Sequence, residues 1–150
     1  MRLSAKERYG VRAMAWLAVN YGCGPVALAE VAARQRIPLR YLEHIARDLK
    51  SSGLVNSHRG VAGGYELALP PERITIADVL RALEGSVLAT ECGVEPVCSY
   101  SDAPDACVSK PLWEALQRQV EESLDRVTLA SVAGRLKGTA VTEGRYNGKC

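Results

Sequence analysis

Apolar residues recur at helical spacing along most of this chain, and they alternate with polar residues only between residues 53 and 69. The helical spacing predicts five helices, over residues 4–20, 28–34, 38–50, 75–85 and 110–134. The alternating stretches GLVNSHR (53–59) and YELAL (65–69) predict two short strands that form a hairpin. We therefore expect a mainly α fold with one small β-hairpin.

Local signals mark several helix ends. Ser4 and Glu7 have the spacing of a capping box, and Thr75 and Asp78 repeat that spacing. In this motif each side chain bonds the other residue's backbone N–H, which satisfies free donors at the helix start. Gly85 is suited to end the helix that Thr75 begins. These residues predict the starts of two helices and the end of one.

The helix predicted at 38–50 has two chemically different faces. Leu42, Ile45 and Leu49 recur on one side, where they can pack against a core. Basic side chains recur at helical spacing on the nearly opposite side, namely Arg40, His44, Arg47 and Lys50. A stripe of this kind offers cations to an anionic surface such as DNA.

The segments around this helix favour a DNA-binding domain. A short helix at 28–34 and a tight turn precede it, and the hairpin that follows has the tip Arg59-Gly60-Val61-Ala62-Gly63-Gly64. Glycine permits backbone conformations that other residues resist, so it suits a tight tip. This order is typical of a winged helix-turn-helix domain, which we place at residues 1–85. Two ordinary amphipathic helices are the alternative.

Charge is distributed unevenly, although the net formal charge is only +2. Residues 1–70 carry 10 Lys and Arg against 5 Asp and Glu, a balance of +5, and residues 71–109 carry 2 against 7, a balance of −5. Residues 110–150 carry 7 against 5, a balance of +2. A basic N-terminal half beside an acidic middle indicates a nucleic-acid surface kept apart from a second function. Four of the basic residues cluster at the start of the first helix: Arg2, Lys6, Arg8 and Arg12.

Several other classes of protein are disfavoured. No Cys-x-x-Cys pair, Ser/His/Asp set, Walker loop or paired catalytic carboxylates support an enzyme. The glycine run at 60–64 is followed by a strand, which is the wrong context for a nucleotide-binding loop. No apolar run approaches the roughly 20 residues of a membrane span, and the charged start MRLSAKERYG is unlike a signal peptide. We therefore expect a cytoplasmic protein that is not an enzyme and has no membrane partner.

The helix predicted at 110–134 has an apolar edge, formed by Leu112, Leu116, Val120, Leu124, Val127 and Leu129. A helix this long at the end of a small DNA-binding domain usually packs against its twin, so we expect a C-terminal dimerisation helix and a homodimer. Packing onto its own domain only is the alternative. Residues 135–150, rich in Gly, Lys, Arg and Thr, are expected to form a flexible tail.

Five cysteines stand at positions 23, 92, 98, 107 and 150. An odd number without a secretion signal argues against a disulfide framework. Three of them fall within sixteen residues, in the loop predicted at residues 86–109. Three soft thiolate donors in one loop favour an iron–sulfur cluster or zinc.

Together these stretches resemble the bacterial winged-helix regulators that include the iron–sulfur cluster regulator IscR and the nitric-oxide-sensing repressor NsrR. The matching stretches span nearly the whole chain: MRLSAKERYGVRAM, GPVALAEVAARQRIPLRYLEHI, GLVNSHRGVAGGYEL, ITIADVLRALEG, the three clustered cysteines, LWEAL and VTLASV. The resemblance implies a homodimer that binds a partly palindromic operator in double-stranded DNA, with recognition helices in major grooves and wings at minor grooves. It also implies an iron–sulfur cluster, two-iron rather than four-iron, held by Cys92, Cys98 and Cys107, whose state sets DNA affinity.

Three features depart from the family pattern. The cysteine spacing is C-x5-C-x8-C, with a second gap longer than the family's usual five residues. Lys110 stands where IscR-type members place a histidine ligand, and Arg8 stands where other members present a carboxylate. A protonated lysine cannot bind a metal. The fourth ligand is therefore open among Glu91, Glu95, Asp102, Asp105, Glu7 of the partner subunit, an external thiolate and a vacant position.

The predicted DNA contacts fall into two classes. Arg40 and Glu43, near the start of the recognition helix, are expected to approach base edges, because Arg pairs with guanine and Glu accepts from cytosine N4. Contacts to phosphates, which fix the register, are expected from Tyr41, Arg47, Lys50 and Arg59. The other residues expected at the DNA surface are Arg2, His44, Gly60, Gly63, Gly64 and Tyr65.

Two other interpretations keep the winged fold. In one, the three cysteines bind zinc or form reversible disulfides, since three soft ligands do not distinguish zinc from iron. In the other, the fold is a protein-interaction adaptor that does not bind DNA.

Overall fold

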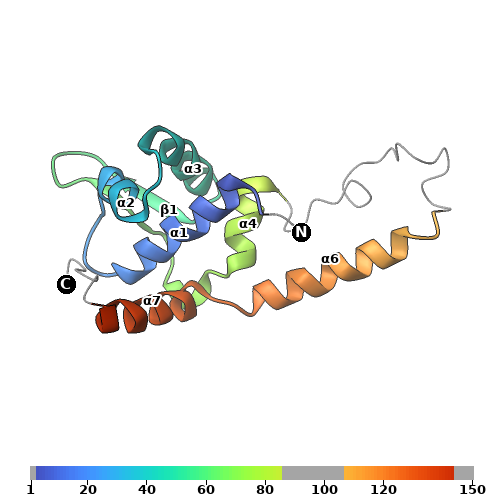
Figure 1. Ribbon diagram of the computed structural model, residues 1–150. Helices are drawn as coiled ribbons and strands as arrows, with labels where there is room; N and C mark the ends of the chain where they lie inside the picture. Colours follow the sequence, from blue (N-terminus) through green and yellow to red (C-terminus); the bar gives the residue numbers. More distant parts are fainter. Residues whose placement is uncertain (1–2, 86–106, 144–150) are drawn as a thin grey trace.

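The computed structural model describes residues 3–85 and 107–143, with side chains described as far as residue 136 (Figure 1). The elements in chain order are α1 (Ala5–Val19), α2 (Leu28–Gln35), α3 (Leu39–Ser51), β1 (Val55–His58), β2 (Gly64–Leu67), the short 3₁₀ helix η1 (Pro71–Arg73), α4 (Ile76–Glu84), α6 (Lys110–Asp125) and α7 (Leu129–Glu143). A mainly helical fold with a two-stranded hairpin confirms the expected fold class.

Helix α1 lies at the centre of the core. Its predicted capping box forms: Ser4 Oγ accepts a 3.0 Å hydrogen bond from the N–H of Glu7, whose carboxylate accepts one of 2.5 Å from the N–H of Ser4. The helix contacts α2, α3, α4, β2 and α7, and Met14 at its middle is fully buried. Gly10 allows α4 to approach closely, because a Cβ there would clash with the side chain of Leu83. Every described element of the winged body therefore depends on α1 or on a neighbour of α1.

The signals at α4 also agree with the prediction. Thr75 and Asp78 form the second capping box, with bonds of 3.1 Å and 2.9 Å. Gly85 ends the helix with φ +75°, a backbone conformation that favours glycine. Val79 and Leu80 bury the inner face of α4 in the core.

The hairpin is a two-stranded antiparallel sheet in which Val55 pairs with Leu67 and His58 pairs with Gly64. A further backbone bridge joins Val26, before α2, to Tyr65 in β2. This bridge attaches β2 of the hairpin to the segment before α2.

The prediction of one continuous helix over 110–134 is wrong. Helix α6 ends at Asp125, and a separate helix, α7, begins at Leu129 (Figure 1). Between them the chain pairs with the segment before α4: Ile76 N–H donates to the Val127 carbonyl (2.8 Å), and Leu129 N–H donates to the Ile74 carbonyl (2.9 Å). These hydrogen bonds replace the helical ones at the break. The regular helix also continues to Glu143, beyond the start of the predicted tail at residue 135.

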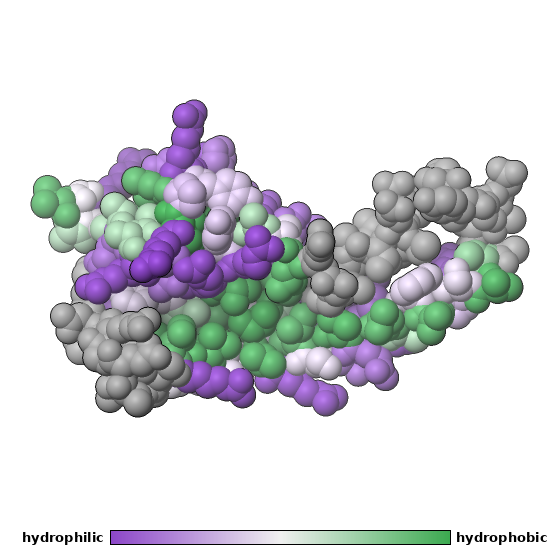
Figure 2. All heavy atoms as spheres, viewed as in Figure 1, coloured by the Kyte–Doolittle hydropathy of each residue, from purple (hydrophilic) through white to green (hydrophobic). Residues whose placement is uncertain are grey.

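The two C-terminal helices have different roles in packing. Helix α7 packs along α1, with Leu129 (0% exposed) and Ala133 (5%) in the core. Helix α6 contains no buried residue and extends from the body as an arm (Figure 1). A band of apolar side chains runs along α6 into the body (Figure 2). Among the described helices, none is both long enough and apolar enough to cross a membrane.

Candidate nucleic-acid interface

Helix α3 presents its polar side to solvent. Leu42 and Ile45 are buried beneath it, and Ala46 and Leu49 lie beside them in the core. The six side chains expected to face DNA from this helix are all exposed: Arg40, Tyr41, Glu43, His44, Arg47 and Lys50. Hydrophilic residues cover the surface above α3, at the top of Figure 2. The helix therefore has the two faces that its sequence predicts.

Two contacts hold α3 against α1. Lys6 Nζ lies 2.9 Å from a carboxylate oxygen of Asp48 and donates a 2.6 Å hydrogen bond to the carbonyl of Leu83 in α4. The hydrogen bond to Asp48 raises the pKa of Lys6 above its ordinary value. The rings of Tyr9 and Tyr41 meet edge to face, with centroids 5.8 Å apart. Both ends of the exposed helix are thus fixed to the body.

The C-terminal end of α3 is also joined to the hairpin. Lys50 Nζ donates a 2.6 Å hydrogen bond to Ser57 Oγ in β1. Within the hairpin, His58 Nε2 lies 2.7 Å from Glu66 Oε1. A phosphate contact by Lys50 would therefore share or replace its bond to Ser57.

The glycines expected near DNA shape the wing tip. Gly60 has φ +103°, and its carbonyl accepts a 3.0 Å hydrogen bond from the N–H of Gly63. A Cβ at Gly63 would clash with the carbonyl of His58, and a Cβ at Gly64 would clash with the backbone of Val26. The tip therefore needs glycine for its own geometry, whether or not DNA approaches it.

The other wing residues lie in different environments. Arg59 is exposed beside the tip, and Val61 at the tip is fully exposed. Tyr65 is half-buried and packs against the core. Arg2 lies outside the described residues, so its predicted DNA contact has no structural description.

Of the three cysteines expected to hold a metal, only Cys107 lies within the described residues; Cys92 and Cys98 fall outside them. Cys107 is half-buried just before α6, and its Sγ lies 3.2 Å from Ser109 Oγ. The hydrogen bond from Ser109 lowers the pKa of the Cys107 thiol below its ordinary value. Because metals bind the thiolate, this environment fits a ligand role for Cys107.

Two other residues bear on the metal hypothesis. Glu7, one of the candidate fourth ligands, is buried with its carboxylate bonded to the backbone of Ser4, so it is poorly placed to leave α1. The described residues contain no group of three His, Cys, Asp or Glu side chains that could hold a metal by themselves. Cys23, in the turn after α1, is disulfide-bonded.

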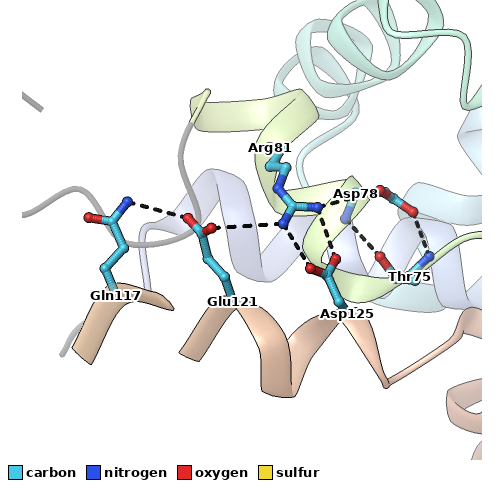
Figure 3. A network of polar contacts seen from close by, with 6 residues as sticks. All are labelled: Thr75, Asp78, Arg81, Gln117, Glu121 and Asp125. Carbon is cyan, nitrogen blue, oxygen red and sulfur yellow. Dashed lines mark hydrogen bonds and ion pairs between the residues drawn. The ribbon is translucent and has the colours of Figure 1, made fainter. Parts of the chain in front are cut away.

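A charged network joins α4 to α6 where the arm leaves the body (Figure 3). Arg81 donates two hydrogen bonds to the carboxylate of Asp125, of 2.9 Å and 3.0 Å. It also lies 3.9 Å from Glu121 and 3.7 Å from Asp78. The Arg81 guanidinium lowers the pKa of Asp125 below its ordinary value. This network does not show in the sequence, because only Asp78 and Arg81 are close along the chain and the other two carboxylates lie about 40 residues away.

Comparison with known proteins agrees with this geometry. The model of the Rrf2 family, described as "Iron-dependent Transcriptional regulator", matches residues 3–135. A helix-turn-helix transcriptional regulator of Neisseria meningitidis is 43% identical over 132 residues, which cover 88% of this chain and 87% of that protein.

Two solved structures share the fold at higher coverage. IscR of T. potens is 37% identical with a TM-score of 0.73, covering 95% of this chain and 91% of that one. CymR, the global cysteine regulator of B. subtilis, is 33% identical with a TM-score of 0.73, covering 90% and 98%. An exposed basic helix and a glycine-tipped wing, found in a chain that matches these regulators over almost its whole length, have one consistent explanation. The chain belongs to the Rrf2 family of winged helix-turn-helix DNA-binding transcriptional regulators.

Proposed function

We propose that this regulator acts as a homodimer on a partly palindromic operator, and that an iron–sulfur cluster bound by Cys92, Cys98 and Cys107 sets its DNA affinity. The observation that carries the proposal is the position of Cys107. Its thiol lies at the start of α6, the helix that leaves the DNA-binding body and exposes apolar side chains. A ligand at this thiol would therefore act directly on the N-terminal end of α6, the end opposite to its contact with Arg81.

The apolar side of α6 supports dimerisation. Leu112, Trp113 and Leu116 are 65%, 37% and 45% exposed, which is costly for large apolar side chains in water. Val120 and Leu124 continue the same edge toward the body, where they pack against the core. A second copy of α6 would cover this edge, since an amphipathic helix that is polar on its other side matches itself across a two-fold axis.

The exposed face of α3 and the wing supply the DNA contacts. Arg40 and Glu43 at the first turns of α3 would read base edges, and Arg47, Lys50 and Arg59 would contact phosphates. In a dimer, two such faces would meet half-sites about one helical turn apart. The cytoplasm is the expected location of such a protein.

A bound cluster would supply a redox- and nitric-oxide-sensitive centre of two irons and bridging sulfides. The chain's own part is to hold thiolates in position: Ser109 stabilises the Cys107 thiolate, and residues 86–106, which carry Cys92 and Cys98, connect α4 to α6 along the chain. A cluster held by these three cysteines would bias the angle at which α6 leaves the body, which is a ligand-dependent switch between two arrangements.

The test is the absorbance spectrum of protein purified without oxygen, with its iron and acid-labile sulfide content. We expect a coloured protein that contains iron and sulfide in matched amounts, and we expect Cys107→Ser to lose both the colour and the iron. The affinities of the cluster-loaded and the cluster-free protein are then measured on operator fragments selected from genomic DNA. Equal affinities of the two forms would contradict the switch and leave the DNA-binding function standing.

A thiol switch without iron is the second candidate. One solved relative, CymR of Staphylococcus aureus, is described in an oxidized form at 34% identity. The Cys107 thiol, whose pKa is lowered by its hydrogen bond from Ser109, would suit such a reaction as well. A colourless protein whose operator affinity changes with thiol oxidation would favour this candidate, and stoichiometric zinc would favour a zinc site. Failure to retain any genomic DNA would favour an adaptor.

A further inference from the structure

The direction of the α6 arm depends on very few contacts. No residue of α6 is fully buried, and the α6 side chains that pack against the core, Val120 and Leu124, lie in its C-terminal half, toward the body. Its C-terminal end is held by the backbone bridge between Thr75 and Thr128, which lies just beyond the helix. Among the described residues, the ion pairs between α6 and α4 all involve one residue, Arg81 (Figure 3).

The geometry of that contact fixes an orientation as well as a distance. Both terminal nitrogens of Arg81 bond Asp125, one to each carboxylate oxygen, at 2.9 Å and 3.0 Å. Two parallel hydrogen bonds between planar groups resist rotation in a way that a single bond does not. Glu121, one turn earlier on the same face of α6, lies 3.9 Å from the same guanidinium. The two carboxylates thus contact Arg81 along one side of the arm.

A small rotation at this point is amplified along the arm. The 16 residues of α6 span about 24 Å at about 1.5 Å per residue. A rotation of roughly 10° at the base would move the far end by about 4 Å on that length. One base-pair step of DNA is about 3.4 Å, with roughly a tenth of a turn of twist. The angle of the arm and the spacing of two half-sites are therefore coupled on the scale of one base pair.

We propose that Arg81, through its two-point contact with Asp125, determines the spacing between operator half-sites that this regulator accepts. The inference rests on the proposed homodimer through α6 and is independent of whether the cysteines bind a metal. Arg81 does not touch DNA in this arrangement; it positions the two recognition helices relative to each other. The Thr75–Thr128 bridge keeps the pivot in place, so loss of the Arg81 contact frees the arm's angle without detaching it.

The experiment measures affinity for a series of operators whose half-sites are separated by the preferred spacer and by one or two base pairs more or fewer. The variants are Arg81→Lys, Arg81→Gln and Asp125→Asn. The matched control is Arg73→Gln on η1, because Arg73 is exposed and makes no ion pair or side-chain hydrogen bond in the described part of the chain. Light scattering gives the oligomeric state of each variant, and a single half-site gives the affinity of the winged body alone.

We expect wild type and Arg73→Gln to discriminate against a one-base-pair change by about tenfold, which corresponds to about 1.4 kcal/mol. Arg81→Gln and Asp125→Asn should reduce that ratio to about threefold or less, with Arg81→Lys between, while the dimer and the half-site affinity stay unchanged. An unchanged spacer profile in Arg81→Gln and Asp125→Asn would overturn the inference. A monomeric wild type, or one without any spacer preference, would overturn the proposed dimeric function itself.

Discussion

Val26 and Tyr65 exchange two backbone hydrogen bonds of 2.8 Å each, which attach the returning strand of the wing to the segment just before α2. Gly64 directly precedes Tyr65, and its Cα faces the Val26 carbonyl so closely that no Cβ fits. The position of the wing relative to the helix-turn-helix thus depends on the close approach of two backbones.

We expect Gly64→Ala to lower the free energy of unfolding by about 1–3 kcal/mol, because the added methyl must displace backbone rather than a flexible side chain. Operator affinity should fall in the same variant, since the bridge that positions the wing is broken. Urea denaturation followed by circular dichroism measures the first effect, and fluorescence anisotropy with labelled operator measures the second.

Gly134→Ala is the matched control for that substitution. Gly134 lies in α7 with open space around its Cα, and alanine is favoured over glycine inside a helix by up to about 1 kcal/mol. Its stability should therefore be unchanged or increased, with unchanged operator affinity. A stable Gly64→Ala protein with normal affinity would show that the wing does not depend on the Val26–Tyr65 bridge.

The exposed residues of α3 and the wing give a prediction about DNA reading. Arg40→Ala should weaken binding to the specific operator by about 1–3 kcal/mol and relax the preference at one base pair, because a bidentate base contact is lost. Arg59→Ala should weaken binding to specific and random DNA alike and reduce the slope of log affinity against log salt by about one.

The measurement is anisotropy with operator and random duplexes over a range of salt concentrations. Glu72→Gln is a suitable control, since Glu72 is exposed on η1 and belongs neither to α3 nor to the wing tip. Identical behaviour of Arg40→Ala and Arg59→Ala on both duplexes would rule out the proposed division between base and phosphate contacts.

The structure also shows which parts of the fold are readable from sequence. Both capping boxes and the two faces of α3 depend on residues a few positions apart, and their spacing predicts them correctly. The apolar pattern does not mark the start of the break at residues 126–128, because Val127 still follows Leu124 at helical spacing, although Leu129, five residues after Leu124, departs from it. The break is caused by backbone bonds to Ile74 and Ile76, which lie far away in sequence.

Contacts between residues far apart in sequence also explain why the charge pattern overstates the number of cations available to DNA. Lys6 counts as part of a basic cluster in sequence, yet its ammonium bonds Asp48 and the carbonyl of Leu83 and so joins three helices. Arg12 likewise donates a hydrogen bond to the carbonyl of Gln35. Part of the N-terminal positive charge therefore serves the fold, and the exposed cations of α3 remain the better candidates for DNA contact.

The exposed apolar edge of α6 predicts a dimer that one substitution should dissociate into monomers. Leu116→Glu should give a monomer in light scattering, because it places a charge on the face that a second copy would bury. Stability of the winged body should stay nearly the same, since Leu116 is 45% exposed in the single chain. Operator affinity should fall at least about tenfold, as the two half-sites are no longer bound together.

Gln119→Glu introduces the same charge on an exposed polar position of α6 and should leave the dimer intact. A dimeric Leu116→Glu protein would show that α6 does not form the interface along this edge. Loss of the dimer in both variants would indicate general charge repulsion rather than a specific apolar contact.

The contact between Arg81 and Asp125 predicts a pH dependence of stability with a definite sign. The guanidinium holds the pKa of the Asp125 carboxyl below its ordinary value of 3.8, so the folded state binds this proton less readily than the unfolded state. The stabilisation is therefore fully present above that ordinary value and is lost as the pH falls through the lowered folded-state pKa.

Urea denaturation of wild type and Arg81→Gln should thus show a difference in unfolding free energy that is constant from pH 7 to about pH 5 and shrinks below pH 4. In the Asp125→Asn background the same Arg81→Gln comparison should lose most of this dependence, because Glu121 and Asp78 lie farther from the guanidinium. A wild-type advantage that persists or grows below pH 3 would mean that Arg81 stabilises the junction by packing rather than through the Asp125 carboxylate.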